Sequence, residues 1–162
     1  MRKTARTILF AAILFPTGSA YAQTPPDKTL SSPADDSEVR PPVTKADLEI
    51  VDHAQRILDS PLKWNRADTR KCPDTAKTFS LYCALEKATY EVTGSFEHRG
   101  AAMQEARFVI EEVAPNWKKY NHRLMDYNND LNTTFDDIQK AFQLLRERIS
   151  KRLTQESSAP KK

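Results

Sequence analysis

The sequence is poor in glycine and cysteine, and these two shortages exclude several familiar kinds of site. Only three of its 162 residues are glycine, and only Gly94 and Gly100 lie beyond residue 22. A phosphate-binding loop or a dinucleotide fingerprint needs several closely spaced glycines, so neither is present. The two cysteines, Cys72 and Cys83, are too few for a four-cysteine zinc site. The three histidines follow no short metal-binding spacing, and we therefore expect no metal and no cofactor.

An excess of charge of one sign is also missing once the first 22 residues are set aside. Of the chain's 25 lysines and arginines, Arg2, Lys3 and Arg6 lie in that segment, which leaves 22 against the 22 acidic residues. Proteins that bind nucleic acid normally cluster positive charge. The even balance therefore predicts no nucleic acid partner.

Residues 1–22 have the pattern of a secretory signal peptide. Basic residues precede the apolar run from Ile8 to Phe15, and Ala20-Tyr21-Ala22 forms a small-x-small cleavage site. This run is too short to span a bilayer, which takes about 20 apolar residues. We expect an exported, soluble protein, periplasmic or secreted, with no stable membrane insertion after cleavage.

Composition divides the rest of the chain into three parts. Residues 23–43 hold five prolines and no apolar period. We expect a disordered Pro/Ser-rich tether there, because such a segment cannot bury enough surface to offset its ordering entropy. Residues 155–162 are polar and predict a disordered tail. Residues 44–154 then form one helical domain.

Apolar residues recur at helical spacing within this domain. The segments that show this period are 44–59, 79–93, 96–114 and about 134–154. Thr44 and Asp47 predict a capping box at the start of the first helix. Gly94 predicts a left-handed residue after the second helix, and Ser95 predicts a cap for the third.

The last helix has the clearest amphipathic stripe, which runs from Phe135 to Leu153. Residues 116–128 stay open between a short helix and a loop. No segment has the alternating pattern of a strand. The expected fold class is all-α, a small bundle of four to five helices with one disulfide-pinned loop. The disulfide joins Cys72 to Cys83, because export brings the chain into an oxidising environment.

Three short motifs follow one another along the chain. They are Trp64 in a loop, Leu81-Tyr82-Cys83-Ala84-Leu85 on a helix, and Asn129-Asp130 ahead of a helix that begins Thr134-Phe135-Asp136-Asp137-Ile138. In this order they resemble a bacterial family of small helical domains of unknown function, over about residues 48–153. The chain departs from the family pattern because it lacks a glycine beside the helical cysteine. The resemblance implies a fold and no activity. It also implies that Trp64, Cys83, Asn129 and Asp130 lie close together.

The segment 64–72 is long for a helix–helix connection, and the expected disulfide restrains it. Long constrained loops on a rigid scaffold often carry binding residues. A structural loop whose tryptophan closes the end of the bundle is an equal alternative. The candidate binding residues are Trp64, Asn65, Arg66, Asn129 and Asp130.

These features favour a binding or interaction module of the cell envelope, with an unidentified envelope protein or glycan as partner and an oligomeric state that stays open. No nucleophile–base pair or metal spacing is visible. The alternative is a small envelope hydrolase for a glycan or peptide, with Asp130 or Glu112 acting together with His122. Size, leader and cysteines also resemble secreted chorismate mutases, but no set of arginines and lysines arranged for a dicarboxylate substrate is visible.

Overall fold

The computed structural model describes residues 40–158, which form helices joined by loops and short 3₁₀ turns. The elements are α1 (Lys45–Ile57), η1 (Pro61–Lys63), α2 (Leu81–Thr93), α3 (Ala101–Val113), η2 (Trp117–Lys119), α4 (Arg123–Asn129) and α5 (Phe135–Ser158). Within 40–158 no strand forms, and the only β contact is an isolated bridge between Trp64 and Phe79. The all-α class is therefore confirmed. The open segment 116–128 becomes η2 and most of α4.

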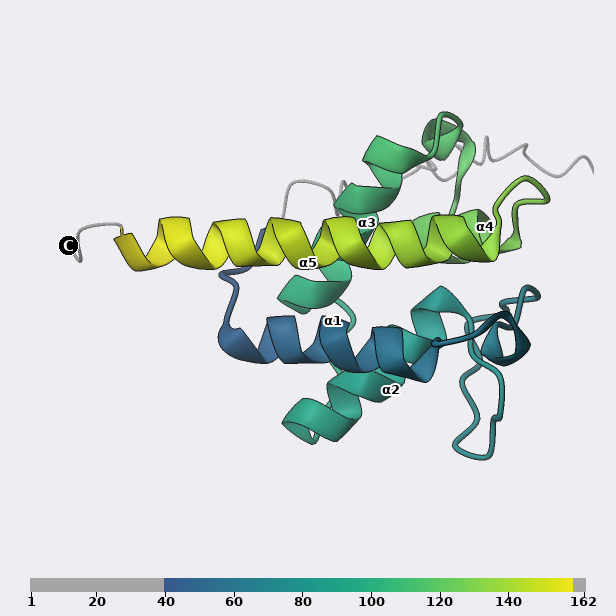
Figure 1. The fold of residues 1–162 in the computed structure, drawn as a ribbon, viewed down its shortest axis with the longest axis horizontal. Helices are drawn as coiled ribbons and strands as arrows, with labels where there is room; N and C mark the ends of the chain where they lie inside the picture. Colours follow the sequence, from purple (N-terminus) through teal and green to yellow (C-terminus); the bar gives the residue numbers. More distant parts are fainter. Residues whose placement is uncertain (1–39, 159–162) are drawn as a thin grey trace, which may run out of the picture. The chain divides into compact units, whose positions relative to one another are not determined.

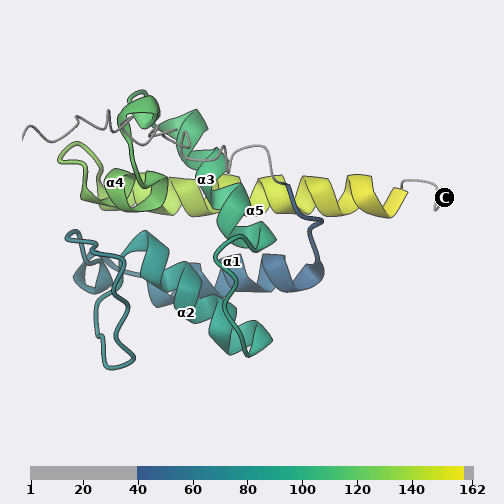
Figure 2. The ribbon, with the colours of Figure 1, turned by 180° about the vertical axis from the view of Figure 1, so that it is seen from behind.

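The helices form two layers. Helices α1 and α5 lie side by side and run in opposite directions (Figure 1). Asp52 of α1 bonds Arg146 of α5, while Gln55, further along α1, bonds Gln139, nearer the start of α5. Seen from behind, α2, α3 and α4 lie across the α1–α5 pair (Figure 2). All described residues belong to one compact unit, Pro33–Lys162.

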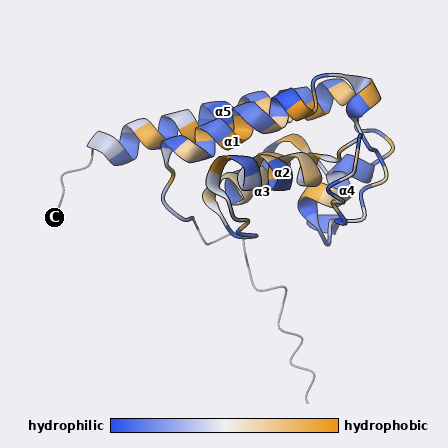
Figure 3. Ribbon diagram, turned by 90° about the horizontal axis from the view of Figure 1, so that it is seen from below, coloured by the Kyte–Doolittle hydropathy of each residue, from blue (hydrophilic) through white to orange (hydrophobic). Residues whose placement is uncertain are grey.

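The core lies between these two layers. The apolar side of α5 faces the second layer (Figure 3), and its residues Ile138, Phe142, Leu145 and Ile149 are at most 1% exposed. These are positions of the predicted stripe, which is therefore confirmed. Burying each such side chain contributes roughly 1.5–3 kcal/mol before ordering entropy is subtracted. The hydrophobic stripe of α5 thus joins the two layers, together with the packing of α1 against α2.

Asp47 joins the start of α1 to the start of α3. Its side chain and that of Thr44 complete the predicted capping box, and its Oδ1 accepts from the backbone N–H of Ala102 at 3.0 Å. The sequence predicts that α3 begins at Phe96, after a cap at Ser95. That prediction is wrong, because α3 begins at Ala101. The helix begins there because the carboxylate of α1 satisfies a free N–H at that point.

Both ends of the described chain differ from the expected boundaries. Val43, within the predicted tether, is buried, and its N–H donates to Glu156 at 3.1 Å. Helix α5 continues through Glu156 to Ser158, past the predicted end at 154. The signal peptide and residues 23–39 of the predicted tether lie outside the described residues. None of the helices within 40–158 is both long and apolar enough to cross a membrane.

Candidate ligand-binding site

The loop between α1 and α2 is fastened at several points. The disulfide Cys72–Cys83 forms as predicted, with the two Cα atoms 5.3 Å apart. Phe79 donates its N–H to the carbonyl of Lys63 at 2.7 Å. Ser80 caps α2 by accepting from the N–H of Cys83 at 3.1 Å. The loop is therefore fixed to the first turn of α2.

Asn128, near the end of α4, connects this loop to the rest of the fold. Its side chain is fully buried. Its Oδ1 accepts from the indole Nε1 of Trp64 at 2.8 Å and from the N–H of Leu81 at 3.0 Å. Its Nδ2 donates to the carbonyl of Asn65 at 2.9 Å and to Oδ1 of Asn129 at 3.1 Å. One amide thus bonds four groups, from the loop, the start of α2 and the neighbouring Asn129.

The expected binding residues gather around this amide, but their polar atoms face one another. Arg66 donates to the carbonyls of Asp130 and Leu131, both at 2.7 Å. Asn129 exchanges two hydrogen bonds of 2.8 Å with the backbone of Asp68. The closeness that the resemblance implies is therefore present for Trp64, Asn129 and Asp130. Cys83, the fourth residue, lies in the first turn of α2, where Leu81 bonds Asn128. These contacts give the residues a positioning role, and their role in binding stays a prediction.

A pocket of about 160 Å³ opens beside this loop, between α2, α3 and the segment that leads into α4. Its charged and aromatic lining consists of Arg70, Arg107, Arg123, His98, His122, Tyr82 and Tyr120. Asn121, Leu124 and Met125 complete the lining, and within 40–158 no aspartate or glutamate contributes to it. We call this site the basic pocket.

Two of the arginines contact histidine rings. One guanidinium nitrogen of Arg70 lies 3.1 Å from both ring nitrogens of His122. Arg107 Nη2 lies 2.9 Å from Nε2 of His98 and 3.0 Å from its carbonyl oxygen. Arg123 lies at another side, with its Nη1 2.7 Å from Glu111 Oε1. Cations from three separate segments therefore surround one small volume.

Arg70 has an unusual backbone conformation. Its φ of 58° is the one positive value among the non-glycine residues of 40–158. Its N–H donates to Oδ1 of the buried Asp68 at 2.6 Å, which stabilises the turn. The other carboxylate oxygen of Asp68 has no hydrogen-bond partner in the described chain. Left-handed non-glycine residues are uncommon and cluster at functional sites.

The two tyrosines keep their protons at any physiological pH. Burial raises the pKa of Tyr82 to about 12, and the neighbouring Glu86 adds to this effect. Burial also raises the pKa of Tyr120 to about 12, helped by Asp130, which accepts its hydroxyl at 3.0 Å. Hydrogen bonds from the N–H of Asn132 and from Tyr120 hold the pKa of Asp130 below its usual value. Asp130 thus positions a ring of the pocket and does not line it.

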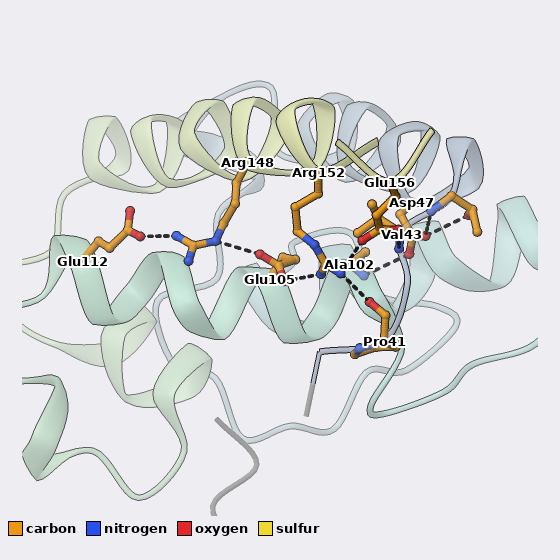
Figure 4. Close-up of polar contacts among 10 residues, drawn as sticks. Pro41, Val43, Asp47, Ala102, Glu105, Glu112, Arg148, Arg152 and Glu156 are labelled. Carbon is orange, nitrogen blue, oxygen red and sulfur yellow. Dashed lines mark hydrogen bonds and ion pairs between the residues drawn. The ribbon is translucent and has the colours of Figure 1, made fainter. Parts of the chain in front are cut away.

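The three residues of the hydrolase alternative do not share a site in the described part of the chain. His122 lines the basic pocket. Glu112 is ion-paired with Arg148, on the side of α3 that faces α5 (Figure 4). Asp130 bonds Tyr120 and Asn132. No hydrogen bond and no shared pocket joins the two carboxylates to the histidine.

A second group of arginines lies between α3 and α5 and has a different environment. Glu105 is fully buried and accepts from Arg148 and Arg152, each at 2.7 Å. Arg152 also bonds the carbonyl of Pro41 at 3.0 Å and Glu156 at 2.6 Å (Figure 4). We call these contacts the Glu105 network. Every cation in it faces a carboxylate, so it fastens α5 to α3 and to the entering chain.

The basic pocket is the site that the sequence did not predict. Tyr82 belongs to one of the three motifs and His122 to the hydrolase alternative, but no sequence spacing joins positions 70, 107 and 123. Among residues 40–158, no group of three or more histidine, cysteine, aspartate or glutamate side chains could hold a metal ion. The lining of the basic pocket offers hydrogen-bond donors, aromatic rings and positive charge.

The fold and the site define a class, a small all-α domain in which a disulfide-pinned loop borders a basic pocket. Residues 42–148 match the model of a family of unknown function, DUF6197, and the chain belongs to this family. Comparison with curated proteins and with solved structures gives no match. No activity is given for this family, so the function is inferred from the residues of the site.

Proposed function

We propose that the protein is an exported binding module of the cell envelope, and that it holds a small molecule, or the end group of a larger one, in the basic pocket. The observation that carries this proposal is that four separate chain segments place cations and aromatic rings around one concave volume. Concave sites with a few convergent polar groups are the usual places for ligands.

The fastened loop supports binding rather than a purely structural role for this region. The disulfide, the Asn128 amide and the Asn129–Asp68 bonds all hold the segment that carries Arg70. A site whose geometry is fixed before the ligand arrives loses less entropy on binding. The leader sequence and the disulfide both favour export.

Export is tested by expressing the full chain with its own leader and measuring the mass of the protein in each cell fraction. We expect a product that begins at Gln23, carries the disulfide and leaves the cytoplasm. A product that retains Met1 and stays in the cytoplasm contradicts export.

Binding is tested by nuclear magnetic resonance of the isotope-labelled protein titrated with the small-molecule fraction of an envelope extract. We expect shifts centred on Arg70, His98 and His122. Asn121→Trp places a large ring on the exposed lining and should abolish these shifts. Asn116→Trp, an exposed change outside the pocket, should leave them intact. No shift with the parent protein, or loss with both variants, contradicts the proposal. Recovery of a chemically altered ligand would favour the hydrolase alternative.

A further inference from the structure

Arg70 is a cation held at the pocket without a carboxylate partner in the described chain. Its guanidinium lies over the ring of Tyr82, 5.9 Å from the centroid, and beside His122. No ion pair joins it to an aspartate or glutamate within 40–158, and its residue is exposed. Because Asp68 fastens this turn, the backbone of Arg70 is held at the edge of the pocket. A fixed cation of this kind is a ready partner for an anion.

The other two arginines approach the same volume from different directions. Arg107 comes from α3 and is 9% exposed, while Arg123 comes from the start of α4 and is 19% exposed at its side chain. Arginine matches oxyanions through a planar fork of N–H donors. A carboxylate offers two oxygens in one plane, whereas a phosphoryl group offers three oxygens that point in three directions. Arg123 is bonded to Glu111, and Arg107 to Gln104 and His98, so each can offer a ligand only its remaining N–H groups. Three arginines that approach from three sides still match a phosphoryl group better than a carboxylate.

The size of the pocket limits what can accompany that group. A volume of about 160 Å³ is open to the centres of water-sized molecules, and about 10–15 Å³ of such space is enough to hold one water. This accommodates a phosphoryl group and a short polar or carbon segment. The tyrosine rings, Leu124 and Met125 form the less polar part of the lining.

From these observations we infer that the basic pocket binds the phosphoryl group of a small phosphate monoester or of a phosphorylated headgroup. This inference rests on the proposed function, because it names the ligand class of the same site. In the complex, the guanidinium of Arg70 donates hydrogen bonds to the phosphoryl oxygens. The ring of Tyr82 lies under this guanidinium.

The test is isothermal titration calorimetry on the full chain with its disulfide formed. Four probes are compared: inorganic phosphate, glycerol 3-phosphate, succinate, and phosphatidylcholine vesicles with or without phosphatidate. We expect glycerol 3-phosphate to bind, inorganic phosphate to compete with it, and succinate to bind at least about tenfold more weakly. Binding only to vesicles that contain phosphatidate would identify a headgroup as the source of the same phosphoryl chemistry.

Two arginine variants separate specific contact from overall charge. Arg70→Gln should weaken glycerol 3-phosphate binding at least about tenfold, the effect of one lost charge-assisted hydrogen bond. Arg56→Gln is the matched control, since Arg56 is also exposed and also contacts a histidine ring, His53, at 3.2 Å, but on α1. It should change the affinity less than about twofold.

Three results would overturn the inference. One is tighter binding of succinate than of either phosphate. Another is an equal loss of affinity in the Arg70→Gln and Arg56→Gln variants, which would mean general attraction of anions. The third is no binding of any phosphate probe while envelope extract still shifts the signals of the pocket. That last result contradicts the inference but agrees with the proposed function. If neither the extract nor any probe binds, both the inference and the proposed function are contradicted.

Discussion

Arg70 of the basic pocket and the arginines of the Glu105 network differ in what faces them. Arg148 and Arg152 meet a fully buried carboxylate at 2.7 Å. Arg70 meets a histidine and a tyrosine ring. Both groups come from a chain that has 22 basic and 22 acidic residues beyond residue 22. A balanced composition therefore does not exclude a local excess of positive charge, because it is the fold that decides which cations are neutralised.

The largest expected effect comes from breaking the Glu105 network. Glu105→Gln leaves two half-buried arginines without their shared carboxylate. Removing one member of a buried ion pair destabilises a protein by about 3–5 kcal/mol. Because Arg148 keeps Glu112 and Arg152 keeps Glu156, we expect a loss of about 3 kcal/mol in chemical denaturation. Glu147→Gln, on the exposed side of α5, is the control and should change stability by less than about 0.5 kcal/mol. Equal effects of the two changes would mean that the network adds no stability.

Reduction of the disulfide tests the fastened loop. The bond joins residues 11 apart in sequence, and closing a loop of about this size contributes roughly 3 kcal/mol in the chain-entropy model. We expect Cys72→Ser with Cys83→Ser to lower unfolding free energy by about that amount and to weaken binding at the basic pocket. Unchanged affinity in a folded double variant would show that Arg70 does not depend on the disulfide.

Asn128→Ala breaks the other fastening of the same loop. It leaves the indole N–H of Trp64 and the N–H of Leu81 without their acceptor. Each buried group left unsatisfied costs about 1–3 kcal/mol. We expect a loss of about 2–3 kcal/mol in urea unfolding, together with a change in tryptophan fluorescence. Asn116→Ala, an exposed asparagine without a side-chain cap, should leave both readouts unchanged.

The smallest effect concerns the start of α5 and depends on pH. Hydrogen bonds from the hydroxyl and the N–H of Thr134 hold the pKa of Asp137 below its usual value of 3.8. A group with a lowered folded pKa stabilises the fold above its unfolded pKa and loses this effect as pH falls through the folded value. Asp137→Asn should therefore lower stability by about 1 kcal/mol at pH 7. The difference from the parent should shrink as pH falls below about 4, and a constant difference would contradict this account.

Much of the helical framework follows from local sequence. The stripe of α5 predicts its buried face because apolar residues recur at helical spacing over a long segment. Thr44 with Asp47, and Gly94 at φ 75°, behave as capping residues should. The start of α3 could not be predicted in this way, because its N–H partner is Asp47 from another helix.

The site depends on contacts between distant segments, so the sequence gives only part of it. The resemblance correctly implies that Trp64, Asn129 and Asp130 lie together. It could not indicate that Asn128 is the amide that joins them, or that their polar atoms are satisfied internally. Arg70, Arg107 and Arg123 come from a loop and two helices, and only the packing of α3 against α4 and the loop brings them to one volume.

The most direct test of the comparison measures two quantities on two variants. Unfolding free energy and affinity for glycerol 3-phosphate are determined for Glu105→Gln and for Arg70→Gln. We expect Glu105→Gln to lose about 3 kcal/mol of stability while the folded protein keeps its affinity. We expect Arg70→Gln to keep its stability and lose at least about tenfold in affinity. If both variants lose stability and neither loses affinity, Arg70 stabilises the fold and does not bind the ligand. That result would contradict the distinction between Arg70 and the arginines of the Glu105 network.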